Sequence, residues 1–171
     1  DPHFLFNTLN GLKTLIRKDP EKAEQYAIEV SGVYRYLLRH NRNTTVTLEE
    51  ELKFLEAYTS LLTLRFEDNF RINLDIDPAF NSRMIFPMSL QLLVENAIKH
   101  NVVTSQHPLL VQVYIAKDQI IVENLINLRS TTDGISQYGL FNLNTLYQLH
   151  YNKEIEIFQY DGVFKVSLPI L

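Results

Sequence analysis

The sequence contains no cysteine, which excludes a disulfide framework and any metal site built on thiolates. It also has no run of about 18 apolar residues, the length that a membrane-spanning helix needs, and no signal-peptide pattern. The net charge is only −4, and no basic arm or stripe is present. Nucleic acid is therefore disfavoured as a main partner, and membrane contact is expected only through segments outside this chain.

What the sequence does contain is ample material for a core, since 46% of its 171 residues are apolar and 11% are aromatic. This composition predicts a folded structure, either one domain or one domain with a helical appendage. The chain begins with Asp1 rather than Met, directly at the start of a helical pattern. We therefore expect a piece of a longer protein, whose other segments include membrane spans.

The first 66 residues carry the pattern of three amphipathic helices. Asp1-Pro2 and Asp19-Pro20 each combine an N-cap residue with a proline suited to the first helical position. Thr47 and Glu50 form a capping box ahead of the third helix. The apolar stripes at helical spacing are Leu5, Leu9, Leu12 and Ile16; Ala23, Ala27, Val30, Tyr34, Leu37 and Leu38; and Leu48, Leu52, Leu55, Leu62 and Phe66. Such helices predict a bundle that a second copy completes, so we expect a homodimer.

From residue 67 onward the hydrophobic period changes. Apolar and polar residues alternate from Phe70 to Ile76, as in a half-buried strand. Further strands are expected at 109–115, 119–123, 154–159 and 163–168, and helices at 87–100 and 139–149. The chain is therefore predicted to be α+β, with a helical segment over residues 1–66. An α/β sandwich over residues 67–171 follows, in which helices cover a mostly antiparallel sheet.

One candidate for chemistry lies in the first predicted helix. His3, Asn7 and Asn10 are spaced at i, i+4 and i+7, so they share one face of that helix. A neutral imidazole on a polar face is accessible and can attack a phosphorus centre. The spacing alone favours a plainer alternative, a solvated histidine in a first turn with two amides beside it.

A second candidate lies in the helix predicted at 87–100. Asn96, Lys99 and His100 are spaced at i, i+3 and i+4, so they cluster on one side. An amide oxygen can bind Mg²⁺, and an ammonium group suits phosphate oxygens. The spacing alone favours an ordinary amphipathic helix with a polar outer face. Glu49-Glu50-Glu51, by contrast, is expected to complement the macrodipole at the start of the third helix.

Taken together and in this order, the two segments resemble those of a known family, the LytS/YehU-type bacterial sensor histidine kinases. Pro2-His3-Phe4-Leu5-Phe6-Asn7-Thr8-Leu9-Asn10 resembles the phosphoacceptor box of these kinases. Phe86-Pro87-Met88-Ser89-Leu90 to Val94-Glu95-Asn96-Ala97-Ile98-Lys99-His100 resembles their N box. The block from Glu49 to Phe66, the run Gly139-Leu140-Phe141-Asn142 and the ending Val166-Ser167-Leu168-Pro169 are also similar. The resemblance covers essentially the whole chain.

The resemblance implies a helical dimerisation segment that presents a histidine, followed by an ATP-binding domain of the GHKL (Bergerat) fold. His3 would be the phosphoacceptor and Asn96 the Mg²⁺ ligand, with Lys99 and His100 close to the phosphates of ATP. The phosphoryl group would then pass to an aspartate of a separate response regulator in a two-component phosphorelay. The chain would be the cytoplasmic portion of a protein of the inner or plasma membrane.

The glycine boxes depart from the family pattern. Where relatives carry Asp-x-Gly-x-Gly, the run Val122–Asn127 has Asn124 in place of the aspartate and no glycine. The second box keeps one glycine, so Gly139 and Leu140 are the contacts expected there, and residues 125–138 would form the ATP lid. The alternative is therefore a degenerate signalling module that dimerises and binds nucleotide weakly or not at all. ATP hydrolysis is not expected, because Leu92 occupies the place of the general base in related ATPases.

Overall fold

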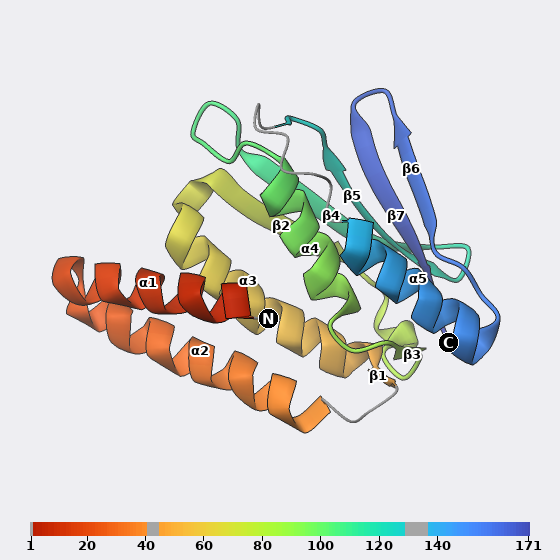
Figure 1. Ribbon diagram of the computed structural model, residues 1–171, viewed down its shortest axis with the longest axis horizontal. Helices are drawn as coiled ribbons and strands as arrows, with labels where there is room; N and C mark the ends of the chain where they lie inside the picture. Colours follow the sequence, from red (N-terminus) through yellow and green to blue (C-terminus); the bar gives the residue numbers. More distant parts are fainter. Residues whose placement is uncertain (1, 41–44, 129–136) are drawn as a thin grey trace.

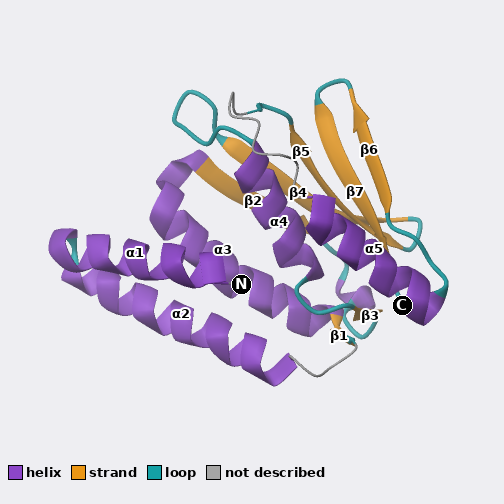
Figure 2. Ribbon diagram, in the orientation of Figure 1, coloured by secondary structure: helices purple, strands orange, loops and turns teal. Residues whose placement is uncertain are grey.

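The computed structural model describes residues 2–40, 45–128 and 137–171. A five-stranded sheet carries helices on one face, and a helical hairpin packs along the outer side of one of these helices (Figures 1 and 2). The helices are α1 (Pro2–Lys18), α2 (Pro20–His40), α3 (Leu48–Phe66), α4 (Ser89–His100) and α5 (Gln137–Tyr151). The strands are β1 (Val46–Thr47), β2 (Phe70–Asp75), β3 (Met84–Ile85), β4 (Leu109–Ala116), β5 (Gln119–Leu125), β6 (Glu156–Tyr160) and β7 (Val163–Pro169).

The large sheet has the strand order β2-β4-β5-β7-β6. Only the pair β2 and β4 is parallel, and the other three pairs are antiparallel. Lys117 and Asp118 turn between β4 and β5 with positive φ, and Asp161 and Gly162 do the same between β6 and β7. Such two-residue turns match the twist of a hairpin. The prediction of an α+β fold with a mostly antiparallel sheet is confirmed.

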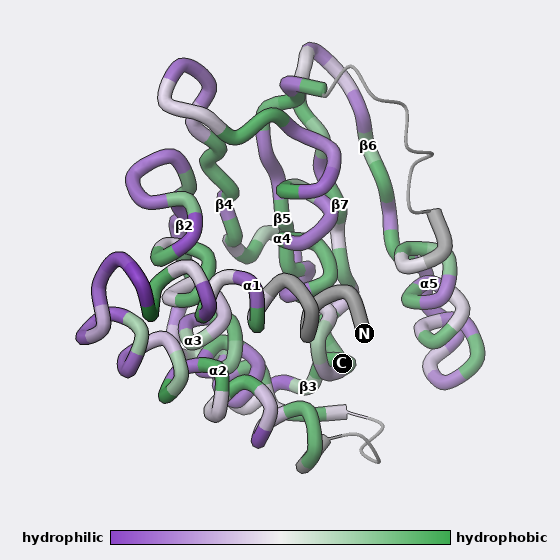
Figure 3. The backbone as a smooth tube through the Cα atoms, turned by 60° about the vertical axis from the view of Figure 1, so that its left-hand side comes forward, coloured by the Kyte–Doolittle hydropathy of each residue, from purple (hydrophilic) through white to green (hydrophobic). Residues whose placement is uncertain are grey.

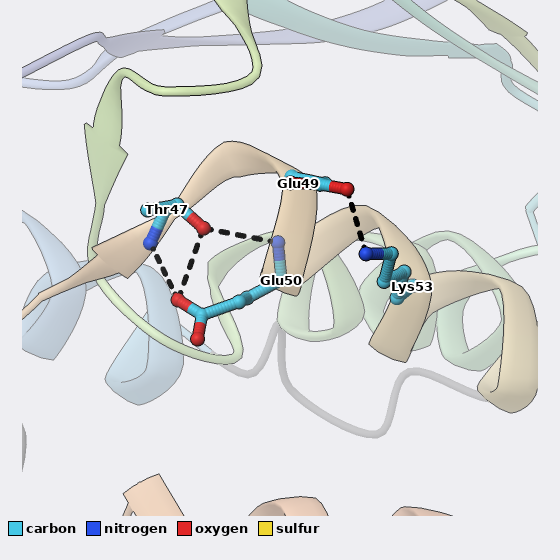
Figure 4. A network of polar contacts seen from close by, with 4 residues as sticks. All are labelled: Thr47, Glu49, Glu50 and Lys53. Carbon is cyan, nitrogen blue, oxygen red and sulfur yellow. Dashed lines mark hydrogen bonds and ion pairs between the residues drawn. The ribbon is translucent and has the colours of Figure 1, made fainter.

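The start of α3 is fixed by the predicted capping box (Figure 4). The Thr47 hydroxyl accepts a hydrogen bond from the Glu50 amide at 3.2 Å, and the Glu50 carboxylate accepts from the Thr47 amide at 3.0 Å. Glu49 pairs with Lys53 one turn later. Just before the helix, β1 pairs with β3, so the chain leading into α3 is held beside the chain leading into α4.

The main core lies between the sheet and the helices that cover it. Its most deeply buried members come from α3, α4, α5 and the inner positions of the sheet: Leu48, Leu55, Leu90, Val94, Val111, Ile120, Tyr147 and Leu168. α3 also contributes Phe54 and Leu61 to a second cluster, which includes Tyr26 and Val33 of α2. α3 is therefore packed on both sides, against the sheet domain and against the hairpin. The predicted boundary between a helical segment, residues 1–66, and a separate domain, residues 67–171, stays a prediction.

The hairpin of α1 and α2 is amphipathic, and Figure 3 shows polar and apolar positions alternating along both helices. The side of α1 that meets its neighbours is shifted from the predicted stripe. Thr8 is buried and Leu12 and Leu15 pack into the second cluster, whereas Leu9 and Ile16 are 51% and 57% exposed. Leu9 and Ile16 of the predicted stripe do not pack within one chain, because α2 contacts α1 along the neighbouring ridge. Their burial by a second copy stays a prediction.

The boundaries of the other elements follow the sequence closely, with one instructive difference. α4 begins at Ser89 and not at Pro87, because Met88 adopts a left-handed conformation with φ of 64°. In the part of the chain that the structure describes, no helix combines the length and apolarity needed to cross a membrane.

Candidate functional site

A pocket of about 160 Å³ opens beside the C-terminal half of α4. Its walls come from α4, the end of β5, the first turns of α5 and the β6–β7 hairpin, which lie together at one end of the sheet (Figure 1). The lining residues are Asn96, Ala97, His100, Asn101, Asn124, Ile126, Leu128, Leu140, Gln159 and Phe164. An apolar pocket with a few polar groups is the usual form of a small-molecule site.

Asn96 is the polar group that the fold leaves without a partner at this pocket. Its side chain is 6% exposed, and its Nδ2 atom makes no hydrogen bond with any described residue. A buried donor without a partner costs roughly 1–3 kcal/mol. A ligand that offers an acceptor here would remove that cost, and the amide oxygen could equally face a cation. The unpartnered Asn96 amide therefore makes this pocket a candidate site for a ligand.

Asn124 faces the same pocket from β5. It is 5% exposed, and its backbone is fixed in the sheet between Val111 of β4 and Phe164 of β7. Its side-chain Nδ2 donates to the Leu125 carbonyl at 2.7 Å, which leaves the amide oxygen as the group that can accept from a ligand. A neutral amide accepts a weaker hydrogen bond than a carboxylate would.

Asn101, which the sequence analysis did not single out, fastens the wall of the pocket. Its Nδ2 donates to the Ala97 carbonyl at 2.8 Å, and its oxygen accepts from the Asn127 amide at 2.6 Å. The Val102 amide also donates to the Asn127 carbonyl at 2.8 Å. The end of α4 is thereby joined to the segment that follows β5. Its position directly after the N box was the only signal in the sequence.

The structure gathers some of the predicted site residues and leaves others apart. Asn96, His100, Asn124 and Leu140 line one pocket although they come from three distant segments. Lys99 is exposed and outside the lining. Gly139 lies against α4 instead, where an added Cβ would come within 2.9 Å of Leu92 Cδ1.

Two of the predicted elements lie partly or wholly beyond what the structure describes. His3 is in the first turn of α1, but its side chain is outside the described part of the chain. Residues 129–136, most of the predicted lid, are also outside the described residues. Gln159 and Phe164 of the β6–β7 hairpin complete the pocket, and nothing in the sequence pointed to them.

Metal binding would depend on the nucleotide. Among the described residues, no three histidine, aspartate or glutamate side chains come together to hold an ion. Mg²⁺ in nucleotide sites is commonly held by one or two protein groups together with substrate phosphates. A single amide ligand such as Asn96 fits that arrangement. The described residues form no cluster of acidic and histidine side chains that would hold an ion without a nucleotide.

Glu51 is the strongest departure from the electrostatics expected from sequence. It is fully buried, and its carboxylate accepts hydrogen bonds from the backbone amides of Met88 at 2.9 Å and Leu90 at 3.0 Å. Burial raises the pKa of Glu51 to about 7, and these hydrogen bonds oppose the rise. The expectation that Glu51 complements the dipole of its own helix is wrong, because its side chain points to the start of α4.

Comparisons with known proteins match parts of this chain to histidine kinases. Residues 1–70 match the histidine kinase family model. The sensor protein LytS of Staphylococcus saprophyticus is 43% identical over 100 residues, which are 58% of this chain and 17% of that protein. The sensor histidine kinase/phosphatase LytS of Staphylococcus aureus is 38% identical over 99 residues, with the same coverage. The aligned region thus spans less than a fifth of the length of these relatives.

A solved structure shares the fold. The cytoplasmic segment of the histidine kinase QseC superposes with a TM-score of 0.50 at 18% identity, covering 74% of this chain and 76% of that one. At this level of identity the match concerns the architecture alone.

Proposed function

Since the resemblance of this chain to the LytS-type sensor histidine kinases is confirmed, we propose that it uses Mg²⁺-ATP to phosphorylate His3 and passes the phosphoryl group to an aspartate of a response regulator. The observation that carries this proposal is the pocket at the end of α4. It brings Asn96, His100, Asn124 and Leu140 together, and it leaves the buried Asn96 amide without a partner among the described residues.

Different residues of the pocket would contact different parts of the nucleotide. The apolar walls, which include Ile126, Leu140 and Phe164, would bury the adenine ring, and the Asn124 oxygen would accept from its amino group. Asn96 would ligate the Mg²⁺ that ATP brings, with His100 beside it. Gly139, which packs against Leu92, would let the start of α5 lie close to α4 beside the pocket, and the exposed Lys99 would lend positive charge near the phosphates. Mg²⁺ would neutralise charge on the phosphates during transfer.

The chemical step is a displacement at the γ-phosphorus of ATP. An imidazole nitrogen of His3 forms the new P–N bond while the bond from that phosphorus to the bridging oxygen breaks, so that ADP leaves. A transfer of this kind depends chiefly on positioning and on charge neutralisation. The aspartate of the response regulator then receives the phosphoryl group and frees His3.

A second candidate function is favoured by the chemistry of Asn124. Its amide group already donates to the Leu125 carbonyl, and it replaces a carboxylate that would bind adenine more strongly. The chain would then be a degenerate GHKL module that dimerises and relays a signal without catalysis. Both candidates share the homodimer, and both would act as the cytoplasmic portion of a longer membrane protein.

Two measurements on the same protein separate these candidates. The first is a thermal-shift titration with Mg²⁺-ATP, where a hundredfold excess over Kd should add about 2.7 kcal/mol of stability. The second is incubation with γ-labelled ATP. We expect both a shift and label in the wild type, and neither in Asn96→Ala. His3→Gln should keep the thermal shift and lose the label, whereas His107→Gln, a change at an exposed loop histidine, should keep both.

The results also show which part of the proposal fails. Label that persists in His3→Gln would refute the phosphoacceptor assignment. A wild type that shows neither shift nor label at millimolar nucleotide would support the degenerate module.

A further inference from the structure

Three elements of the fold meet at the buried carboxylate of Glu51. The residue belongs to the first turn of α3, and its side chain reaches the first turn of α4. One oxygen accepts from the Leu90 amide, and the other accepts from both the Met88 amide and the Tyr36 hydroxyl of α2, at 2.9 Å each. Among the residues that the structure describes, no other fully buried side chain carries a charge.

The carboxylate replaces a cap that α4 lacks. The first backbone amides of any helix have no partner within the helix, and a side chain just before it normally accepts from one of them. Met88 occupies that place in α4 and makes no such hydrogen bond. Glu51 supplies the acceptor from another helix, and its negative charge matches the positive end of the α4 dipole.

The Tyr36 hydroxyl extends this contact to the histidine-bearing hairpin. The Tyr36 ring stacks on Phe54 of α3, with centroids 4.1 Å apart and planes 10° from parallel. Its position is therefore set by packing, and its hydroxyl is aimed at Glu51. Asn96 lies six residues after Leu90 on the same helix, about 9 Å along the axis at 1.5 Å per residue. A shift at the start of α4 moves Asn96 with it, because a short helix behaves as a rigid rod.

We infer that Glu51 is a positioning residue, which holds the start of α4 and so places Asn96, and which ties this placement to α2 through Tyr36. The effect of this placement of Asn96 on phosphoryl transfer rests on the proposed function. The hairpin that carries His3 and the helix that carries Asn96 thereby share one polar contact.

Three variants of the 171-residue chain test the inference. Glu51→Gln keeps the shape of the side chain but replaces one acceptor oxygen with a donor group. Tyr36→Phe removes the hydroxyl and keeps the ring on Phe54. Glu49→Gln is the matched control, the same change two residues earlier at an exposed side chain that pairs with Lys53.

The first measurement needs no nucleotide. Amide hydrogen exchange at Leu90, followed by NMR at pH 7.5, should become about tenfold faster in Glu51→Gln and several-fold faster in Tyr36→Phe, and the side-chain amide signals of Asn96 should move in both. Glu49→Gln should change neither. If exchange at Leu90 and the Asn96 signals are unchanged in both variants, Glu51 does not position α4 and the inference is wrong, whatever happens to the melting temperature.

The second measurement separates binding from transfer. In Glu51→Gln the Kd for Mg²⁺-ATP should rise about tenfold. In Tyr36→Phe the Kd should change less than twofold, while the rate of His3 labelling at saturating ATP falls several-fold. Equal Kd values and equal rates in the wild type and both variants would contradict the coupling. If the wild type binds no nucleotide, the proposed function fails, and the exchange measurement alone decides whether Glu51 positions α4.

Discussion

At the scale of single residues, two buried polar side chains differ in whether the described residues satisfy their hydrogen bonds. The Glu51 carboxylate accepts hydrogen bonds from the Met88 and Leu90 amides and from the Tyr36 hydroxyl. Asn96 has a buried amide nitrogen with no partner among the described residues. A buried group that is fully satisfied stabilises one arrangement of the chain, whereas one that is left open costs stability until a ligand arrives. Glu51 therefore stabilises the fold around the pocket, whereas Asn96 is the group that the proposed ligand would satisfy.

Glu51 also makes the stability of the fold depend on pH. Its pKa is raised from an ordinary 4.5 to about 7 by burial, with hydrogen bonds from Met88, Leu90 and Tyr36 opposing the rise. Because the folded state holds this proton more tightly than the unfolded state, the contribution is complete below about pH 4.5 and is lost as the pH rises through about 7. At about 1.36 kcal/mol per pKa unit, we expect the ionisation of Glu51 to lower the free energy of unfolding by roughly 1–3 kcal/mol as the pH rises through this range.

Urea unfolding of the wild type and Glu51→Gln at pH 5.5, 7.0 and 8.5 measures this dependence. The fall in stability with rising pH should be smaller in Glu51→Gln, while Glu49→Gln should behave as the wild type does. Parallel pH profiles for the wild type and Glu51→Gln would show that the carboxyl group does not titrate in this range.

At the scale of elements, the contact between α1 and α2 depends on a small residue. Gly11 of α1 faces Tyr26 of α2, and a Cβ at this position would lie 2.8 Å from the Tyr26 hydroxyl. Gly32 of α2 has open space around it, with nothing within 4 Å. Close packing on Tyr26 thus explains the glycine at position 11, whereas no contact explains the glycine at position 32.

Replacing each glycine with alanine separates these cases. Alanine favours a helix over glycine by about 1 kcal/mol, so Gly32→Ala should stabilise the protein by up to that amount. Gly11→Ala should gain less or lose stability, because Tyr26 is 4% exposed and has to shift to make room. We expect the two variants to differ by about 1–2 kcal/mol in urea unfolding. Equal gains would show that α1 does not pack closely on Tyr26.

At the scale of the whole molecule, the apolar surface of the hairpin is incompletely covered. Leu9 and Ile16 of α1 and Ile28 and Leu38 of α2 are exposed, from 51% for Leu9 to 78% for Leu38. Their side chains lie at positions that the sequence assigned, in all but Ile28, to packed stripes. A second copy of the chain that covers these residues accounts for both facts and agrees with the proposed homodimer.

The dimer is tested with a matched pair of surface leucines. Leu9 of α1 is 51% exposed and Leu110 of β4 is 47% exposed. Burying a leucine at an interface is worth roughly 1.5–3 kcal/mol, so Leu9→Ser should raise the dimer Kd by about tenfold or more. Leu110→Ser should leave it within about twofold. Analytical ultracentrifugation gives both values, and equal dissociation constants for the two variants would place the interface elsewhere.

The sequence by itself determined the local elements and the class of fold. Asp19-Pro20, the Thr47–Glu50 capping box and the Asp161-Gly162 turn each specify backbone geometry through neighbours in the chain, and each appears as predicted. The alternating pattern of β2 and the helical pattern around Asn96 likewise follow from periodicity, which is a local property.

Only the tertiary structure decided which polar groups meet. Glu49, Glu50 and Glu51 are indistinguishable in a charge pattern, yet one pairs with Lys53, one caps its own helix and one is buried against α4. The difference arises because successive side chains on a helix point in directions about 100° apart, so that packing against α2 and α4 selects a single one. For the same reason, Asn96 and Asn124 line the same pocket because the fold places β5 beside α4. Contacts across long separations in the sequence are set by how the layers pack, and no local pattern encodes them.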